Sequence, residues 1–282
     1  MKKYDVQYTY THGMQVTHDG PRHAPPLLLI HGSGAAGASW DLMVPALAAR
    51  RHVIRVDLPG CGHSPPASSY AVPEQAAKVA ALLDSLELTG VAVAGHSSGG
   101  YVATALAEQR PDLVAALALV STGPSLDALL RQPLLLRVLL GPPFGPLLWS
   151  LRSDAWIRGG IRATAARPVD VPDQLVADVR GTTYRAFRKV LRANSAYLAE
   201  RSVPERLAAL PRPVPVLVVF GEGDRRWEPS SARQYDTVPN TRIEMLPGVG
   251  HVPLIEAPDV TGDLLLAFTG TVAGIPPAVP EA

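Results

Sequence analysis

The chain has 282 residues with a formal net charge of +1, and 47% of its residues are hydrophobic and 18% charged. This composition is typical of a globular protein with a sizeable buried core, and its balanced charge does not favour nucleic acid or a membrane surface as a partner. The single cysteine, Cys61, excludes an internal disulfide. The first residues lack the apolar run of a secretory signal, and Pro, Gly and Arg interrupt the leucine-rich stretch 128–151. We therefore expect a cytoplasmic protein with no membrane partner.

Strand signals begin with residues 4–10 and 14–17, which predict an antiparallel pair joined by a turn at His12-Gly13. Short apolar runs follow, and they are too rich in Leu, Val and Ile for strands with one face in water. These runs cover residues 27–30, 52–57, 91–94, 116–120 and 214–220, and a more mixed strand covers 242–246. Continuous apolar runs of this length suit strands that are covered on both faces, so they predict a parallel sheet.

Helix signals lie between the strands. Over residues 72–86 the apolar side chains recur at helical spacing, and Pro73 suits the first turn of a helix. Further helices are expected between Ser97 and Pro111, over 231–237 and over 257–268. Strands that alternate with helices predict an α/β fold with a mostly parallel, doubly wound sheet.

The alternation stops between residues 123 and 211. This segment is rich in Leu, Arg and Pro, and it shows helical spacing but no strand-length apolar run. We interpret residues 123–211 as a helical cap that is inserted into a core formed by residues 1–122 and 212–270. Residues 271–282 are small and proline-rich and are expected to form a disordered tail.

The predicted cap carries much apolar surface. Its large apolar residues include Leu134, Leu135, Leu136, Leu139, Leu140, Phe144, Trp149, Trp156, Tyr184 and Phe187. Most of them must form the core of the cap and its seat on the sheet, but a lid also lines the pocket beneath it, and pockets are mostly apolar. We therefore expect a substrate with a hydrophobic acyl or alkyl group. The arginines of the segment are interpreted as solvated helix faces: Arg152, Arg158, Arg162, Arg185, Arg188 and Arg192.

Residues 93–100 read Val-Ala-Gly-His-Ser-Ser-Gly-Gly, so a G-x-S-x-G pattern joins a predicted strand to a predicted helix. A serine in such a tight turn takes a strained backbone conformation, which needs small neighbours and exposes the hydroxyl above the sheet. Ser97 is therefore the candidate nucleophile, and the alternative is a buried turn with an incidental serine. The backbone N–H of Ser98, at the amino end of the helix, is expected to stabilise negative charge.

A serine hydroxyl is a poor nucleophile near neutral pH and needs a base that is held by an orienting acid. Asp224 comes directly after the predicted strand 214–220, and His251 follows the predicted strand 242–246. Catalytic groups of open α/β sheets gather at the carboxyl ends of strands, so these side chains can meet Ser97. The order Ser97, Asp224, His251 is the order expected for such a site.

Other residues with reactive side chains are weighed against these three. Glu222 and Glu228 remain alternatives for the acid, whereas Asp127 lies several residues too deep in the predicted cap. Asp57 begins a glycine-rich turn, where we expect it to accept hydrogen bonds from backbone N–H groups. Cys61 has no base at a recognisable spacing, which makes a thiol nucleophile improbable. Trp227, just after Asp224, is a candidate for contact with the substrate.

Taken together, five motifs in this order resemble the α/β-hydrolase superfamily, in its cap-bearing branch of serine hydrolases. The motifs are His31-Gly32-Ser33-Gly34, Asp57-Leu58-Pro59-Gly60-Cys61-Gly62-His63-Ser64, Gly95-His96-Ser97-Ser98-Gly99, Gly221-Glu222-Gly223-Asp224 and Gly250-His251. The resemblance implies an α/β-hydrolase fold with Ser97 as nucleophile, His251 as general base and then acid, and Asp224 as the residue that fixes the imidazole tautomer. It also implies an oxyanion hole formed by the backbone N–H groups of Ser33 and Ser98.

The resemblance further implies hydrolysis of a carboxylic ester or lactone through an acyl-enzyme on Ser97. Water is the second substrate, so no metal or organic cofactor is expected, and we expect a monomer or a homodimer. Thioester cleavage, or a cyclase or lyase reaction, would use the same machinery. Residues 31–40 also resemble hydrolases that cleave a C–C bond of a vinylogous diketone, although the tryptophan usual after the late histidine is absent here. A ligand receptor on the same scaffold is the non-enzymatic alternative.

Overall fold

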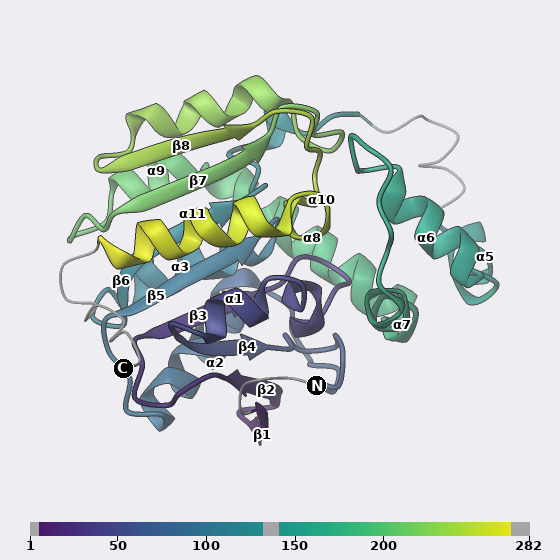
Figure 1. Ribbon diagram of the computed structural model, residues 1–282. Helices are drawn as coiled ribbons and strands as arrows, with labels where there is room; N and C mark the ends of the chain where they lie inside the picture. Colours follow the sequence, from purple (N-terminus) through teal and green to yellow (C-terminus); the bar gives the residue numbers. More distant parts are fainter. Residues whose placement is uncertain (1–5, 132–140, 272–282) are drawn as a thin grey trace.

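The computed structural model describes residues 6–131 and 141–271 and shows one eight-stranded sheet with helices on both faces (Figure 1). The strand order is β1-β2-β4-β3-β5-β6-β7-β8. The hairpin β1 (Val6–Thr11) and β2 (Met14–Asp19) is antiparallel and pairs antiparallel with β4, whereas all later neighbours are parallel. The remaining strands are β3 (Pro26–Ile30), β4 (His52–Val56), β5 (Val91–His96), β6 (Val114–Val120), β7 (Val216–Gly221) and β8 (Thr241–Leu246). The predicted mostly parallel sheet is confirmed.

Helices cover the two faces of this sheet. One face carries α2 (Val72–Ser85), α3 (Gly99–Gln109) and α9 (Val203–Ala208), and the other carries α1 (Val44–Ala48) and α11 (Pro258–Gly270). Pro73 lies in the first turn of α2, as the sequence predicts. The helix predicted over residues 231–237 is instead a 3-10 helix, η3 (Pro229–Thr237), because its polar start favours turns over a regular α-helix.

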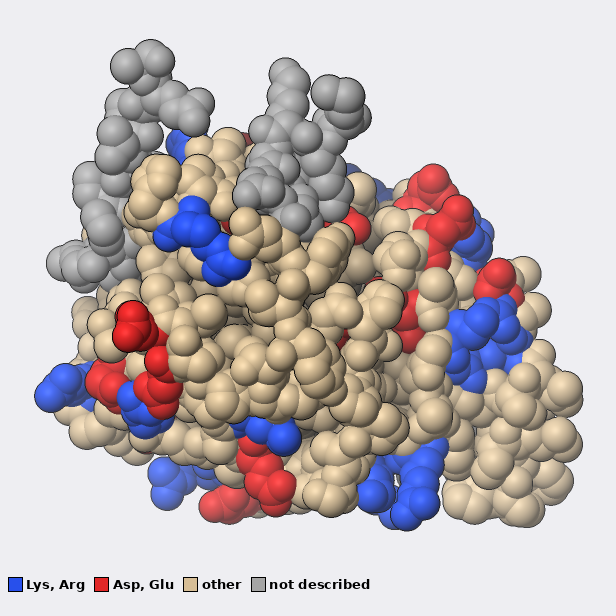
Figure 2. Space-filling view, turned by 90° about the horizontal axis from the view of Figure 1, so that it is seen from below, with Lys and Arg blue, Asp and Glu red and all other residues tan. Residues whose placement is uncertain are grey.

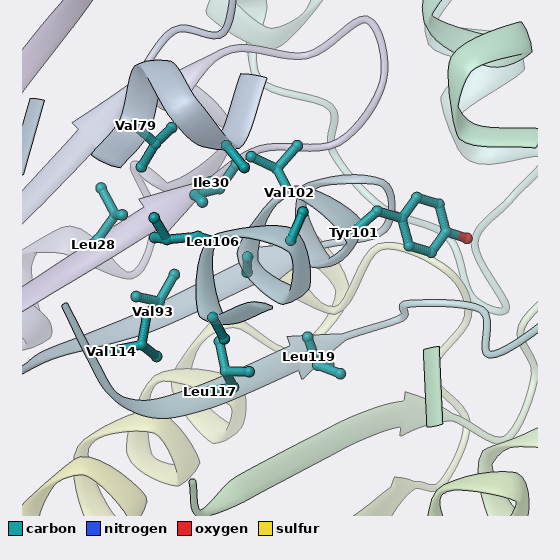
Figure 3. Packing of buried hydrophobic residues seen from close by; sticks show 14 of the residues in the cluster. Leu28, Ile30, Val79, Val93, Tyr101, Val102, Leu106, Val114, Leu117 and Leu119 are labelled. Carbon is teal, nitrogen blue, oxygen red and sulfur yellow. The ribbon is translucent and has the colours of Figure 1, made fainter. Parts of the chain in front are cut away.

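The core consists of two buried clusters, one on each face of the sheet. Side chains of β3 alternate between them: Leu28 and Ile30 join the cluster under α2 and α3, and Leu27 and Leu29 join the cluster under α1 and α11. Figure 3 shows the first cluster, where side chains of α3 pack between those of β3, β5 and β6. Burial of each such leucine stabilises the fold by about 1.5–3 kcal/mol. Both faces are apolar, which explains the unbroken hydrophobic runs.

The segment between β6 and β7 is helical and lies beyond the carboxyl ends of the strands (Figure 1). It begins with the short 3-10 helix η2 (Leu126–Ala128) and continues with α5 (Phe144–Ser150), α6 (Asp154–Arg162), α7 (Asp173–Gly181) and α8 (Tyr184–Glu200). Side-chain caps begin α6 and α8, because Ser153 and Thr183 accept hydrogen bonds from backbone N–H groups of the first turn. Within the predicted cap boundaries, α9 packs on α3, and its residues Val203 and Leu207 belong to the core cluster.

Some sequence predictions fall outside the described residues. These are the start of the first strand, the leucines between residues 134 and 140, and all of the predicted tail except Thr271.

The face seen in Figure 2 carries acidic and basic side chains in small mixed groups, with wide areas that carry neither. This distribution agrees with the net charge of +1 and creates no extended field of one sign on that face. In the described ranges, no helix has both the length and the apolar character that a membrane crossing requires.

Candidate active site

Ser97 lies at the corner between β5 and α3 with φ = 51°, a left-handed conformation that is strained for a serine. Its glycine neighbours are required by space. A Cβ on Gly95 would lie 2.5 Å from the backbone N of Gly100, and one on Gly99 would lie 2.3 Å from the carbonyl O of Ile30. The predicted tight turn with small neighbours is therefore confirmed, and it leaves Ser97 partly exposed above the sheet.

The structure brings Ser97, His251 and Asp224 into one series of hydrogen bonds. His251 Nδ1 lies 2.9 Å from Asp224 Oδ2, and His251 Nε2 lies 3.1 Å from Ser97 Oγ. A carboxylate only accepts, so Nδ1–H donates to Asp224 and Nε2 is left as the acceptor for the serine hydroxyl. The side chain of Asp224 is completely buried. Its second oxygen, Oδ1, accepts from the backbone N–H groups of Arg226 at 2.7 Å and Trp227 at 3.0 Å, so the carboxylate is held at both oxygens.

The alternative acids lie elsewhere. Glu222 and Glu228 are exposed on either side of Asp224, and Asp127 is exposed in the 3-10 helix η2. Asp224 is the carboxylate that contacts the imidazole of His251.

Glu256, which the sequence analysis did not single out, holds the loop of His251. It ends the short helix α10 (Pro253–Glu256) and is buried. Its Oε2 accepts from the N–H of Gly250 at 2.8 Å, and its Oε1 accepts from the N–H of Val252 at 3.1 Å. Oε2 also accepts from the N–H of Ala166, in the loop after α6, at 2.9 Å. One buried carboxylate thus fixes the residues on both sides of His251, and it ties them to the α6–α7 loop.

A second histidine, His96, contacts the same loop through the backbone of His251. His96 Nε2 lies 3.0 Å from the carbonyl O of His251, so this nitrogen must be the protonated donor. Burial lowers the pKa of His96 to about 3, which keeps its ring neutral at physiological pH. His96 therefore donates to the backbone of His251, and its ring also lies against the imidazole of His251, with the ring centroids 5.5 Å apart.

The loop after β3 brings Ser33 beside Ser98. In the described part of the chain, neither backbone N–H donates a hydrogen bond, so both are available to an incoming group. The two hydroxyl oxygens lie 2.8 Å apart, and Asn194 of α8 donates through Nδ2 to Ser33 Oγ at 3.0 Å. Sequence analysis missed Asn194, because its role depends on the placement of α8 over this loop.

A cavity of about 700 Å³ opens above Ser97. It lies between the strand ends and the helices α6 to α8, and it reaches Ser33, Ser98 and His251. Of the apolar cap residues considered above, Trp149, Trp156 and Phe187 line the cavity, whereas Phe144 is exposed to solvent. Trp227 also lines it, so it stands where it could contact a substrate.

The interpretation of the cap arginines as solvated helix faces is wrong for Arg152 and Arg188, and Arg158 is half-buried as well, where it donates to the carbonyl O of Val171 and pairs with Asp173. Arg152 is buried, and its guanidinium donates to four backbone carbonyls, those of Trp149, Val179, Arg180 and Thr182. Arg188 is half-buried in the cavity wall. Helical spacing does not distinguish an arginine that faces water from one that faces a cavity.

Two residues outside the hydrogen-bonded series behave as the sequence predicts. Asp57 accepts from the backbone N–H groups of Gly37 at 2.8 Å and His63 at 2.9 Å, which organises its glycine-rich turn. Burial raises the pKa of the Cys61 thiol to about 12, so the reactive thiolate does not form at physiological pH. Across residues 6–131 and 141–271, no group of three His, Cys, Asp or Glu side chains could hold a metal ion.

The sequence model of the alpha/beta hydrolase family matches residues 27–264, so the chain belongs to the alpha/beta hydrolase family, and its sheet is the one expected for that fold. The protein is a hydrolase, and several of its relatives are esterases or other hydrolases.

Two curated relatives cover nearly the whole chain. A putative 2-succinyl-6-hydroxy-2,4-cyclohexadiene-1-carboxylate synthase of Bacillus subtilis is 27% identical over 95% of this chain and 99% of its own. A pimeloyl-[acyl-carrier protein] methyl ester esterase of Aeromonas hydrophila is 32% identical over 87% of this chain and 96% of its own. Among solved structures, an N-acyl homoserine lactonase superposes with a TM-score of 0.79 at 20% identity, covering 97% of this chain and 99% of that one. At that identity the likeness concerns the fold alone.

Proposed function

We propose that this hydrolase cleaves a carboxylic ester or lactone with a hydrophobic group, through an acyl-enzyme on Ser97. The observation that carries the proposal is the continuous series from Asp224 through His251 to Ser97, which ends beneath an apolar cavity. The esterase activity named for the Aeromonas relative agrees with this substrate class.

In the first half of the reaction, Ser97 Oγ attacks the carbonyl carbon and His251 Nε2 takes the hydroxyl proton. The charge that develops on the carbonyl oxygen is stabilised by the N–H groups of Ser33 and Ser98, which have no other partner in the described chain. His251 then gives its proton to the leaving alcohol, and the C–O bond breaks. Asp224 stays ionised and holds the imidazole in the tautomer that accepts at Nε2.

In the second half, a water molecule attacks the acyl carbon, and His251 removes a proton from that water. Collapse of the intermediate breaks the bond to Ser97, whose oxygen recovers the proton from His251. The product is a carboxylic acid, and the enzyme returns to its starting state. The helices α5 to α8 act in this proposal as a cap that shields the acyl-enzyme from bulk solvent.

The test is trapping of the covalent intermediate. Purified protein is mixed with short- and medium-chain 4-nitrophenyl esters, a lactone, a thioester and a vinylogous diketone, and the acyl adduct is located by mass spectrometry of peptides. We expect ester or lactone turnover and an adduct on Ser97, absent in Ser97→Ala and retained in the surface control Ser230→Ala. Activity confined to the diketone or the thioester would overturn the ester assignment. The protein is also treated with a fluorophosphonate, which labels activated serines. If it neither hydrolyses any of the substrates nor is labelled, a ligand receptor is favoured instead.

A further inference from the structure

The cavity above Ser97 has cationic but no anionic side chains in its described wall. Arg152, Arg188 and Arg226 line it, and no Asp or Glu among the described residues does. Arg152 is occupied by backbone carbonyls. The guanidinium groups of Arg188 and Arg226 have neither an ion pair nor a hydrogen bond within residues 6–131 and 141–271. A half-buried positive charge without a counterion attracts an anionic ligand, because partial burial leaves the charge less screened than it is in bulk water.

Arg226 is anchored next to the reacting groups. Its backbone N–H donates to Asp224 Oδ1 at 2.7 Å, and its carbonyl O accepts from the N–H of Leu130 at 2.9 Å. The backbone is therefore fixed on both sides, and the side chain starts beside the acid that holds His251. This placement differs from that of its neighbour Arg225, which is exposed and does not line the cavity.

Two residues that line the cavity with Arg226 each carry a buried polar atom without a hydrogen-bond partner in the described chain. The indole of Trp227 packs against Gly123, where a Cβ would lie 2.2 Å from Trp227 Cδ2, and its Nε1–H is buried without a partner in the described chain. Tyr101 lies in the first turn of α3, and its buried hydroxyl also has no partner in the described chain. In Figure 3 its ring extends away from the packed cluster, with the hydroxyl outermost. Buried donors are normally satisfied, and an acceptor brought into the cavity would satisfy these two.

The charge of Arg226 acts on Tyr101. Burial raises the pKa of the Tyr101 hydroxyl well above its usual range, and the positive charge of Arg226 opposes this shift. The hydroxyl therefore stays protonated and remains a donor, within electrostatic reach of the guanidinium. The Arg and Trp side chains only donate hydrogen bonds, and the protonated Tyr hydroxyl can donate as well, so the three can present N–H and O–H groups to an acceptor such as a carboxylate.

We infer that Arg226, Tyr101 and Trp227 form a subsite for a carboxylate of the substrate, so that the preferred ester carries a second, free carboxylate away from the reacting carbonyl. The inference rests on the proposed ester hydrolysis at Ser97. Leu129 and Leu198, which line the same cavity, provide an apolar wall for the chain between the two carboxyl groups. The substrate class is a half-ester of a dicarboxylic acid.

The experiment compares 4-nitrophenyl half-esters of dicarboxylic acids with 4-nitrophenyl alkanoates of the same chain length, from five to eight carbons. The quantity measured is the ratio of kcat/KM for the charged and the neutral ester. We expect a ratio of about 10 or more for at least one chain length in the wild type, as a charge-assisted contact provides. The ratio should fall to near 1 in Arg226→Gln and by several-fold in Tyr101→Phe, mainly through KM. Arg225→Gln, a matched loss of charge one residue away, should keep the wild-type ratio.

The outcomes separate this inference from the proposed function. If neutral esters are hydrolysed but no half-ester is preferred at any length, the subsite is wrong and the ester hydrolase stands. If no ester is hydrolysed, the proposed function itself fails. A preference that is lost in Arg188→Gln and kept in Arg226→Gln would move the subsite to the other arginine and overturn the assignment. An equal loss of the ratio in Arg225→Gln would show a general effect of net charge.

Discussion

Glu256 holds His251 without touching its side chain: the carboxylate bonds the backbone N–H groups of Gly250 and Val252, the residues directly before and after the histidine. The imidazole therefore takes its position from two separate carboxylates. Asp224 orients the ring, and Glu256 fixes the backbone from which the ring projects. A third N–H, that of Ala166, shares Glu256 Oε2, so the same contact joins the loop to the segment after α6.

Replacement of Glu256 is expected to impair catalysis as well as stability. In Glu256→Ala, three backbone N–H groups lose their acceptor, at a cost of about 1–3 kcal/mol for each buried group left unsatisfied. The loop then shifts, and a displacement of about 1 Å at His251 can reduce turnover on the order of 100-fold. Glu256→Gln, which keeps one carbonyl oxygen as an acceptor, should retain more of the stability and more of the turnover than Glu256→Ala. Denaturant unfolding and kcat measured on the same ester check this. A variant that is less stable but fully active would show that Glu256 has no positioning role.

Ser97→Ala should reduce turnover to near the uncatalysed background and leave the fold intact. The substitution removes one partly exposed hydroxyl and its hydrogen bond to His251 Nε2, and it leaves the packing of the core unchanged. Initial rates and circular dichroism test the two halves of this expectation. Substantial residual activity would mean that a different group attacks the substrate.

Asp224→Asn is expected to lower kcat by about 10³–10⁴, because the amide can donate to His251 Nδ1 and favour the wrong tautomer, as the corresponding substitution does in serine proteases. Glu222→Gln, an exposed neighbour on the same loop, should stay within twofold of the wild type as a matched control. Full activity of Asp224→Asn would show that another carboxylate serves as the acid.

The glycines around Ser97 offer a test of the turn. Gly99→Ala places a Cβ 2.3 Å from the carbonyl O of Ile30, so the backbone must move, which we expect to cost about 1–3 kcal/mol of stability and most of the activity. Gly262→Ala in α11 is the control, because its Cβ meets no atom within 4 Å. It should stabilise the helix by about 0.5–1 kcal/mol. The free energy of unfolding of both variants is measured with urea. Equal stabilities would contradict the steric argument.

Acidification should destabilise the protein through His18 and His52, whose rings stack between β2 and β4. Burial lowers the pKa of each to about 4, and the charge of Arg22 acts in the same direction. The native state therefore keeps both rings neutral, whereas the unfolded chain binds protons near pH 6.5. The contribution of the two neutral rings to the free energy of unfolding is fully present above about pH 6.5. It is lost as the pH falls toward 4, by on the order of 2–3 kcal/mol. Urea unfolding from pH 7 to 4 measures this slope.

Replacement of one of these histidines should flatten that slope. His52→Gln removes one of the two depressed groups, whereas His23→Gln removes an exposed histidine and should leave the slope unchanged. A slope that is identical in the wild type and in His52→Gln would contradict the assignment.

The sheet could be predicted from the sequence because continuous apolar runs such as 27–30 have one good solution, a strand covered on both faces. Ser97, Asp224 and His251 could be selected because each follows a strand at a turn, where the local pattern is strong. The geometry brings them together as expected, and their catalytic roles remain predictions that the experiments above test.

The local sequence pattern does not predict the role of a side chain when that role depends on packing between distant segments. Asn194 and Glu256 resemble ordinary polar residues of helices, and only the placement of α8 and α10 makes them partners of Ser33 and of the His251 loop. Arg226 and Arg225 are adjacent and chemically identical, yet one lines the cavity and the other faces water. This difference arises from the tertiary structure, so the spacing of residues in the sequence cannot predict it.

The hydrogen bond from Asn194 to Ser33 Oγ crosses from the covering helix to the core. If α8 moves outward to admit a large molecule, this bond must break, and Ser33, whose backbone N–H is proposed to stabilise the reacting oxygen, loses its contact with α8. With this bond broken the cavity is open to a substrate, and with the bond formed Ser33 is held in place for the reaction, so the two conditions exclude each other. We therefore expect the full rate of reaction only after α8 has returned to its position over the bound substrate.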